Sequence, residues 1–304
     1  MLREIVIDGT RIADDTDCYV IAEIGHNHQG SIDLCKAMFK SAKDAGANAV
    51  KLQKRDNKTL YSKEMYNRPY NSENAFGPTY GTHREALEFN FDQYMQLKVY
   101  AGQLGISFFA TAFDIPSAQL LRLVGMPAIK IASGDLTNLE LLHHVGRFGV
   151  PIILSTGGGN YDQVEQAWNA LGTDDFALLQ CTSGYPARYD ELNLRVIETY
   201  RRQFPYTAIG LSDHTSGIAM ATLAYTLGAR IIEKHFTLDR TLKGTDQAFS
   251  LEPSGMRKLV RDLKRARLAL GDGVKRRFTS ENQPLLKQEK HLVDGVMVID
   301  GQQR

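Results

Sequence analysis

Residues 176–214 read FALLQCTSGYPARYDELNLRVIETYRRQFPYTAIGLSDH, and this stretch decides the fold. It begins with a short apolar run at 176–181, continues through a helix-length segment at 192–202, and reaches a second apolar run at 207–212. Short runs that are apolar throughout are typical of strands in a parallel sheet, where both faces are covered. The stretch therefore predicts a strand, a crossover helix and a second, parallel strand.

The same pattern of an apolar run followed by a helix-length segment occurs eight times along the chain. The predicted strands are 18–24, 49–53, 107–111, 128–132, 151–155, 176–181, 207–212 and 230–234, and the helices behind them are 32–45, 91–103, 115–124, 139–148, 161–171, 192–202, 217–227 and 254–270. No G-x-G-x-x-G follows the first strand, which argues against a dinucleotide-binding fold. Residues 17–272 are therefore predicted to form one catalytic (β/α)8 barrel, an α/β TIM barrel.

Three segments fall outside the repeated pattern. Residues 2–12 resemble a β-hairpin with Asp8-Gly9 at its turn, and we expect the segment 1–16 to cap the bottom of the barrel. Residues 54–90 form an unusually long connection, and long connections are often lids or binding loops. Residues 273–304 are polar and poorly periodic, and are expected to form a C-terminal tail.

Composition excludes several classes of protein. The 304 residues carry 36 Lys and Arg against 35 Asp and Glu, a net charge of +1, which argues against binding to nucleic acid. No window approaches the roughly 18 consecutive apolar residues of a membrane span, and the N-terminus lacks the features of a signal peptide. Cys18, Cys35 and Cys181 are far apart in mostly apolar surroundings, which is typical of buried thiols in a reducing compartment. We expect a cytoplasmic protein that does not act on membranes.

Two lysines lie inside apolar strands, where alternation would point them into the barrel. A buried lysine is costly unless it has a partner or an anionic ligand. One interpretation is an internal salt bridge of Lys51 or Lys130 with Glu23 or Glu233. The other is an anion-binding cradle, in which both lysines act with four hydroxyl groups at strand ends, Thr111, Ser133, Ser155 and Ser212. The cradle, which we favour, would suit a small phosphate ester that also carries a carboxylate.

Two histidines, His214 and His235, end consecutive predicted strands, so their imidazoles can converge. Each stands beside an acidic residue, Asp213 or Glu233. Two imidazoles with open positions for water and substrate predict a divalent-metal site, although a single histidine in such a place is more often a hydrogen-bonded structural residue. His26 and His28, after the first strand, are expected to serve packing.

The ordered motifs IAEIGHNHQGS, KLQ, TYGTHREALEF, FFATAFD, IKIASGDLTN, PIILSTGG, LLQCTSGYP, IGLSDHT and IEKHFTLDR make residues 17–270 resemble the sialic acid synthase family. The resemblance implies a (β/α)8 barrel, a homodimer formed through it, and a role in making cell-surface polysaccharide. It also implies the condensation of phosphoenolpyruvate with an aldose of the N-acetylmannosamine type, giving a 3-deoxy-2-ulosonic (nonulosonic) acid and phosphate.

The resemblance also assigns roles to residues. It implies that His214 and His235 bind a divalent metal ion, Mn²⁺ or Mg²⁺. It implies phosphoenolpyruvate contacts from Lys51, Thr111, Lys130, Ser133, Ser155 and Ser212, and sugar-side or acid–base roles for Glu23, Gln53, Tyr185, Glu233 and Asp246. At Ser183 many members of the family have the longer Asn, which makes this substrate contact a departure from the pattern. Typical members continue into an antifreeze-like domain whose arginine holds the sugar's acyl-amino group, and we expect no such domain within 273–304.

Two other functions remain open at this point. A Schiff-base aldolase would use Lys130 as the nucleophilic amine. A non-catalytic sugar-phosphate sensor would keep the barrel without the chemistry, although it would not need both lysines and both histidines. The synthase reading accounts for all these residues.

Overall fold

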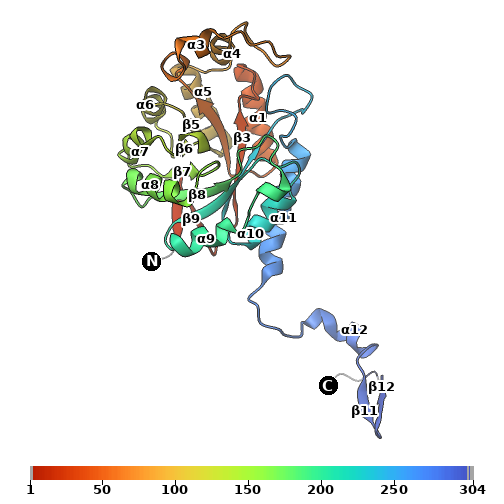
Figure 1. Cartoon of the computed structure of the whole chain (residues 1–304). Coiled ribbons are helices and arrows are strands. Elements are labelled where there is room, and N and C mark those ends of the chain that lie inside the picture. The colour runs from red at the N-terminus through yellow and green to blue at the C-terminus, as the bar shows by residue number, and fades with distance from the viewer. Residues whose placement is uncertain (1–2, 300, 302–304) are drawn as a thin grey trace. The chain divides into compact units, whose positions relative to one another are not determined.

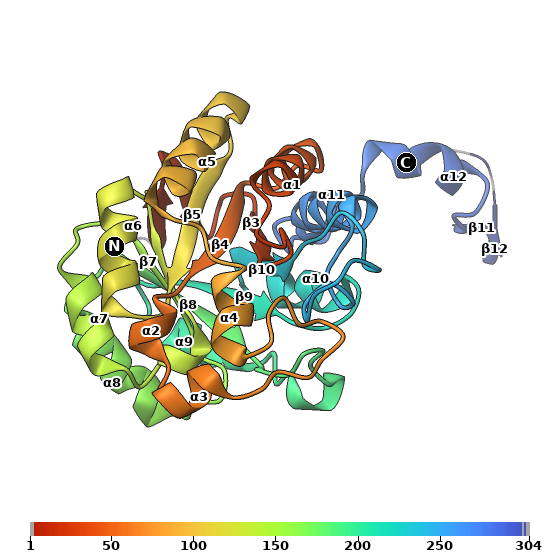
Figure 2. The same cartoon turned by 90° about the horizontal axis from the view of Figure 1, so that it is seen from above.

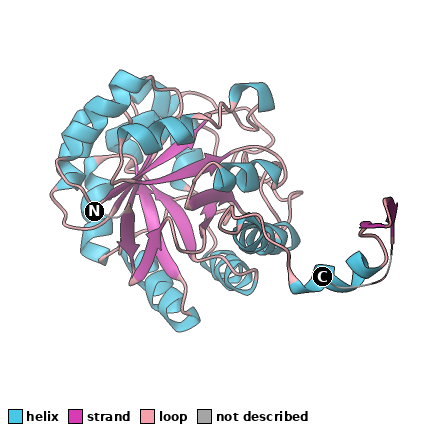
Figure 3. Ribbon diagram, turned by 90° about the horizontal axis from the view of Figure 1, so that it is seen from below, coloured by secondary structure: helices cyan, strands magenta, loops and turns pink. Residues whose placement is uncertain are grey.

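The computed structural model describes residues 3–299 and 301, and its main part is a closed barrel of eight parallel strands surrounded by helices (Figures 1–3). The barrel strands are β3 (Tyr19–Gly25), β4 (Ala49–Lys54), β5 (Ser107–Ala112), β6 (Ile129–Ile131), β7 (Ile152–Ser155), β8 (Phe176–Cys181), β9 (Ala208–Asp213) and β10 (Ile231–His235), and β10 pairs with both β9 and β3 to close the ring. The predicted TIM barrel is confirmed.

The outer layer consists of one principal helix after each strand. These are α1 (Ile32–Asp44), α5 (Phe91–Leu104), α6 (Ile115–Val124), α7 (Leu139–Gly146), α8 (Tyr161–Leu171), α9 (Val196–Gln203), α10 (Ala219–Thr226) and α11 (Pro253–Leu270), with 3-10 turns η1 (Ser133–Asp135) and η2 (Tyr189–Glu191). Glycines in the left-handed region end α5 at Gly105 and α6 at Gly125, where a side chain would be strained. The apolar face of each helix packs on strands that are almost fully buried.

Two helices begin later than the sequence pattern predicts. The predicted helix 192–202 begins at Val196, because Asn193 has a φ of 42°, which no right-handed helix accommodates. The predicted helix 217–227 begins at Ala219, because Gly217 has a φ of 84°. Both differences lie at the carboxyl end of the barrel, where the chain turns around the pocket described below.

The N-terminal hairpin closes the amino-terminal end of the barrel. Strands β1 (Glu4–Ile7) and β2 (Thr10–Ala13) pair antiparallel, and positive φ angles at Asp8 and Gly9 form the two-residue turn between them. Ile7 and Ile12 belong to the barrel's buried core. The Asp8 carboxylate accepts a hydrogen bond of 3.0 Å from the Ser107 hydroxyl, at the start of β5. The hairpin therefore caps the bottom of the barrel, as predicted.

The long connection after β4 contains three short helices, α2 (Asn57–Leu60), α3 (Lys63–Asn67) and α4 (Tyr80–Glu85). Figure 1 shows α3 and α4 at the end of the barrel opposite the N-terminal hairpin. A side chain at Gly81 would collide with the Tyr66 ring, whose atoms lie 2.4 Å from the ideal Cβ position, so a glycine is required where α3 meets α4. This segment brings residues far from any strand to the mouth of the barrel.

The chain divides by its internal contacts into two units, with the boundary between Arg267 and Leu268. The second unit contains the end of α11, the 3-10 turn η3 (Thr279–Glu281), the short helix α12 (Asn282–Leu286) and a hairpin of β11 (His291–Val293) with β12 (Val296–Val298). The composition of this stretch predicted only a polar tail. The hairpin turn Asp294-Gly295, with positive φ at both residues, is the signal for local structure that lay within it.

Candidate active site

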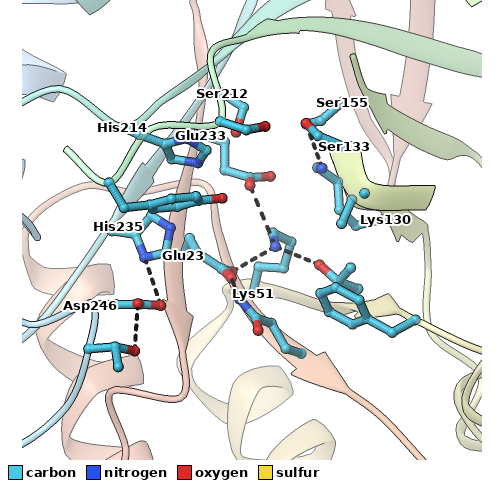
Figure 4. Close-up of a pocket in the computed structure, with 18 of the residues that line it drawn as sticks. Glu23, Lys51, Lys130, Ser133, Ser155, Ser212, His214, Glu233, His235 and Asp246 are labelled. Carbon is cyan, nitrogen blue, oxygen red and sulfur yellow. Dashed lines mark hydrogen bonds and ion pairs between the residues drawn. The ribbon is translucent and has the colours of Figure 1, made fainter. Parts of the chain in front are cut away.

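A pocket of about 380 Å³ opens at the carboxyl ends of the barrel strands. All fourteen residues singled out from the sequence line it: Glu23, Lys51, Gln53, Thr111, Lys130, Ser133, Ser155, Ser183, Tyr185, Ser212, His214, Glu233, His235 and Asp246. Strand alternation explains much of this convergence, because residues two apart on a strand face the same side. On β10, for example, Glu233 and His235 face the lumen together (Figure 4).

Lys51 lies at the centre of a buried network of charges (Figure 4). Its ammonium is 2.8 Å from a Glu23 carboxylate oxygen and 3.5 Å from one of Glu233, and it donates to the Thr111 hydroxyl at 2.7 Å. The Gln53 amide donates to the other oxygen of Glu23 at 2.7 Å. For Lys51, the salt-bridge interpretation is therefore correct, and its charge is already balanced by protein groups.

The two carboxyl groups of this network differ in acidity. Burial raises the pKa of Glu23, and Lys51 offsets only part of this rise. Burial would also raise the pKa of Glu233, but the nearby ammonium groups of Lys130 and Lys51 bring it below its ordinary value. One Glu233 oxygen, Oε2, is buried without a hydrogen-bond partner among the described residues. A pair of carboxyl groups with opposite shifts suits one proton donor and one acceptor.

Lys130 differs from Lys51 because it has no carboxylate partner among the residues that the structure describes. It is 2% exposed and donates to the Ser155 hydroxyl at 2.6 Å and to the Ile131 carbonyl at 2.9 Å. Burial lowers the pKa of Lys130, and the Glu233 carboxylate, which forms no close ion pair with it, offsets only part of this shift. A buried ammonium held only by neutral oxygens has unused capacity for an anion, which is the cradle that the sequence pattern predicts.

Two further hydroxyls of the pocket, those of Ser133 and Ser183, lie against Gly157. The backbone N–H of Gly157 donates to the Ser133 hydroxyl at 2.9 Å. A side chain at Gly157 would meet the Ser183 oxygen at 2.4 Å and the Ser133 oxygen at 2.9 Å. Gly157 is therefore one position of the glycine run after β7 where a side chain is excluded, because only a bare backbone allows Ser133 and Ser183 to approach it together.

The two histidines predicted to bind metal lie next to each other on one side of the pocket, with ring centroids 5.5 Å apart (Figure 4). Nδ1 of His214 lies 2.9 Å from the Thr182 carbonyl oxygen, to which it donates, so the lone pair remains on Nε2. Nδ1 of His235 is buried without a hydrogen-bond partner among the described residues, and Asp246 lies 3.8 Å away. Tyr185 covers the site, with its ring centroid 4.2 Å from that of His214.

This arrangement fits a divalent cation with two protein ligands. An imidazole whose other nitrogen is fixed by a carbonyl is a typical metal ligand, and an unpartnered buried ring nitrogen is a second donor. Within the described part of the chain, no group of three or more His, Cys, Asp or Glu side chains is arranged to hold an ion. A metal at His214 and His235 would therefore need water or substrate oxygens to complete its coordination.

The sequence patterns missed four polar or aromatic residues of the pocket: Arg55, Arg84, Phe113 and Thr245. Arg55 follows β4 directly, and Arg84 comes from α4 in the long connection, which has no strand or helix periodicity to place it. Two signals were available, the unusual length of this connection and the motif TYGTHREALEF, which contains Arg84. His26, which we expected to serve packing, lies between the two arginines, whereas His28 stacks on Phe89 with a centroid distance of 4.2 Å.

Similar proteins point to one family. The human N-acetylneuraminate-9-phosphate synthase is 38% identical over 295 residues, which cover 96% of this chain and 82% of the human protein. The N,N'-diacetyllegionaminic acid synthase of Legionella pneumophila is 38% identical over 274 residues, 87% of this chain and 76% of that protein. A crystal structure of the N-acetylneuraminic acid synthetase of Leptospira borgpetersenii in complex with citrate superposes with a TM-score of 0.79 at 36% identity, covering 94% of this chain and 96% of that one.

Among the described residues, no helix is both long and apolar enough to cross a membrane.

The family model for the NeuB family matches residues 38–275, and the relatives above cover most of this chain at more than a third identity. Both observations confirm the resemblance drawn from the ordered motifs. The chain belongs to the NeuB family.

Proposed function

We propose that this protein condenses phosphoenolpyruvate with an aldose to give a 3-deoxy-2-ulosonic acid and phosphate. The observation that carries the proposal is the Lys130 cradle, a buried ammonium that has no close carboxylate partner among the described residues and donates to Ser155, in a pocket that the hydroxyls of Ser133 and Ser183 also line. Relatives named as sialic acid, legionaminic acid and pseudaminic acid synthases support the same reaction class. They do not support the aldolase or sensor readings.

In the proposed reaction, C3 of phosphoenolpyruvate attacks the aldehyde carbon of the open-chain sugar, and its oxygen takes a proton. Water then adds to C2, and the resulting tetrahedral carbon expels phosphate to leave the 2-keto acid. Lys130 and its hydroxyls hold the phosphate, and Lys51, fixed by Glu23 and Thr111, faces the carboxylate. Holding both reactants in place supplies much of the rate in such a two-substrate reaction.

The carboxyl groups perform the proton transfers in this scheme. Glu23, whose pKa burial raises, is our candidate for the group that gives a proton to the aldehyde oxygen and, once ionised, removes a proton from the attacking water. Glu233, with its unpartnered Oε2, accepts a hydrogen bond from a sugar hydroxyl. Asp246 stands at the mouth beside His235 and is placed to recognise sugar hydroxyls, together with Gln53 and Tyr185.

His214 and His235 would hold a divalent cation, Mn²⁺ or Mg²⁺. When bound there, the cation would supply Lewis-acid polarisation of the aldehyde oxygen. The protein's own contribution is to fix the His214 tautomer through the Thr182 carbonyl. Ser212 and Tyr185 line the same wall of the pocket.

Other features bear on the cellular compartment, the oligomeric state and the acceptor sugar of the enzyme. All three cysteines are free and buried, which supports a cytoplasmic location. Homodimerisation through the barrel rests on the family resemblance. The relatives differ in whether their named product carries a phosphate, so the comparison leaves the acceptor sugar open.

The test is release of inorganic phosphate from phosphoenolpyruvate in the presence of a panel of aldoses. We expect release only with an aldose, loss of release after treatment with a chelator, and recovery with Mn²⁺. Calorimetry should show weaker metal binding in His214→Ala and His235→Ala. This measurement distinguishes a loss of metal affinity from a loss of turnover with another cause. Trapping of a keto substrate on Lys130 by borohydride would instead establish the aldolase and overturn the proposal.

A further inference from the structure

Two arginines border the pocket without a role in the chemistry proposed above. Arg55 follows β4, and Arg84 lies on α4, so both belong to the long connection between β4 and α5. Arg55 is only 8% exposed. Its guanidinium stacks on Phe113 at 3.6 Å from the ring centroid, and this contact fixes the plane of the guanidinium at the edge of the pocket.

The two guanidinium groups share one imidazole. NH1 of Arg55 lies 3.4 Å from His26 Nε2, and NH1 of Arg84 lies 3.4 Å from His26 Nδ1. Burial, followed by the two positive charges, lowers the pKa of His26 well below its ordinary value, so the ring is neutral. A neutral imidazole accepts at one nitrogen only. Whichever nitrogen carries the proton, one of the two guanidinium groups therefore faces an N–H and not an acceptor.

The nearby carboxylate of Glu88 does not pair with either guanidinium. Its Oε2 accepts from the Lys54 ammonium at 2.7 Å and from the Arg55 backbone N–H at 3.2 Å. Its Oε1 lies 3.5 Å from His26 Nε2 and has no hydrogen-bond partner among the described residues. Arg84 donates to the Tyr80 hydroxyl at 2.9 Å, and its Nε is buried without a partner. Within the described ranges, neither guanidinium forms an ion pair with a carboxylate. Two like charges thus lie side by side, under-supplied with acceptors, and both face the pocket.

We propose that Arg55 and Arg84 together bind a phosphate ester of the acceptor sugar, at the end of the sugar remote from its aldehyde. The inference rests on the proposed function and deepens it by naming the substrate class as a phosphorylated aldose. Two planar forks on one group match the several oxygens and double charge of a phosphate monoester better than a single carboxylate. The phosphate of phosphoenolpyruvate already has its own cradle at Lys130.

The position of the arginines explains which end of the sugar they contact. The aldehyde must reach phosphoenolpyruvate, which is held by residues of the barrel strands. Arg55 and Arg84 instead belong to the segment that Figure 1 places over the carboxyl end of the barrel. A sugar that extends from the strand ends toward this segment would present its last carbon to the two arginines.

The experiment compares an aldose with its terminal phosphate ester in the phosphate-release assay, using wild type, Arg55→Gln, Arg84→Gln and Arg84→Lys. Wild type should prefer the ester in kcat/KM by ~10²-fold or more. Each Gln variant should lose about 10- to 100-fold of that preference, and Arg84→Lys should lose less, because it keeps the charge but not the fork. Arg68→Gln, an exposed arginine of the same segment outside the pocket, is the matched control and should keep the full preference.

Three results would overturn the proposal: no preference for the ester in wild type, equal losses for both sugars in the Gln variants, or a raised KM for phosphoenolpyruvate with an unchanged ester preference. The last result would assign the arginines to the other substrate. If no aldose supports turnover, the proposed function fails. Phosphate binding by Arg55 and Arg84 is then tested by calorimetric binding of the ester alone. Equal affinity of wild type and Arg84→Gln for the ester would contradict the proposal.

Discussion

Two buried lysines on barrel strands behave in opposite ways. Lys234 on β10 points away from the lumen, is 1% exposed, and pairs with Asp213 of the neighbouring β9 at 2.9 Å. Lys130 on β6 is 2% exposed and points into the lumen, where the Ser155 hydroxyl and the Ile131 carbonyl are the only groups among the described residues that accept its protons. The two lysines are equally buried, but a carboxylate of the protein balances the charge of Lys234, whereas Lys130 can bind an anionic ligand.

The comparison shows that burial alone does not identify a functional charge. In a buried ion pair each charge offsets part of the free energy that its partner loses on leaving water. Lys234 and Asp213 form such a pair between the neighbouring strands β10 and β9. A buried cation without an anion costs stability, and that cost persists only where a ligand offsets it. A buried charged side chain without a close partner of opposite charge is therefore the better candidate for binding a ligand.

The largest expected effect is that of Lys130→Met, a neutral side chain of similar length. The variant should lower kcat/KM for phosphoenolpyruvate by ~10³-fold or more, because the charge that holds the phosphate is gone. Its free energy of unfolding should change less than in the Lys234 variant described next, since Lys130 forms no close ion pair among the described residues and interacts with Glu233 only at longer range. Steady-state kinetics and urea denaturation measure the two quantities. Activity within tenfold of wild type would show that Lys130 is not the phosphate holder.

The matched change is Lys234→Met, which should act on stability first. It leaves Asp213 buried without its cation, and we expect a loss of about 3–5 kcal/mol in the free energy of unfolding. The double variant Lys234→Met, Asp213→Leu removes both charges and should recover most of the loss. If Lys234→Met unfolds no more easily than Lys130→Met, the contrast between the two lysines is wrong.

The smallest effect tests how Lys130 is held. Ser155→Ala removes the hydroxyl that accepts from Lys130 at 2.6 Å but leaves the Ile131 carbonyl in place. We expect a fall of about tenfold in kcat/KM for phosphoenolpyruvate, the equivalent of one ordinary hydrogen bond of ~1.4 kcal/mol. Lys130→Met already lacks the ammonium, so adding Ser155→Ala to it should change little. Fully additive effects would indicate that Ser155 acts independently of Lys130.

The sequence predicted the barrel because its strands are short apolar runs with polar residues at their ends. The strand at 176–181 is found with unchanged bounds, and alternation correctly directed Lys51 and Lys130 into the lumen. Alternation states where a side chain points but not what it reaches. The pairing of Lys51 with Glu23 and Glu233 was therefore only one of two readings until the strands were placed side by side.

Other features were beyond sequence patterns for physical reasons. Arg55 and Arg84 reach the pocket through a connection of short helices, where no periodicity relates position in the chain to direction in space. The helix before β9 begins late because a single residue, Asn193, adopts a left-handed conformation. Such a conformation depends on its surroundings, and Asn tolerates it without demanding it.

The central claim, condensation in which water attacks C2 and phosphate leaves with the bridging oxygen, is tested most directly by isotope labelling. Phosphoenolpyruvate carrying ¹⁸O between C2 and phosphorus is incubated with the protein, Mn²⁺ and the best aldose of the panel, and the inorganic phosphate is examined by mass spectrometry. We predict that phosphate is released only when the aldose is present and that it retains the ¹⁸O. Phosphate without the label would mean cleavage at phosphorus, and equal release without an aldose would mean hydrolysis without condensation; either result would contradict the account.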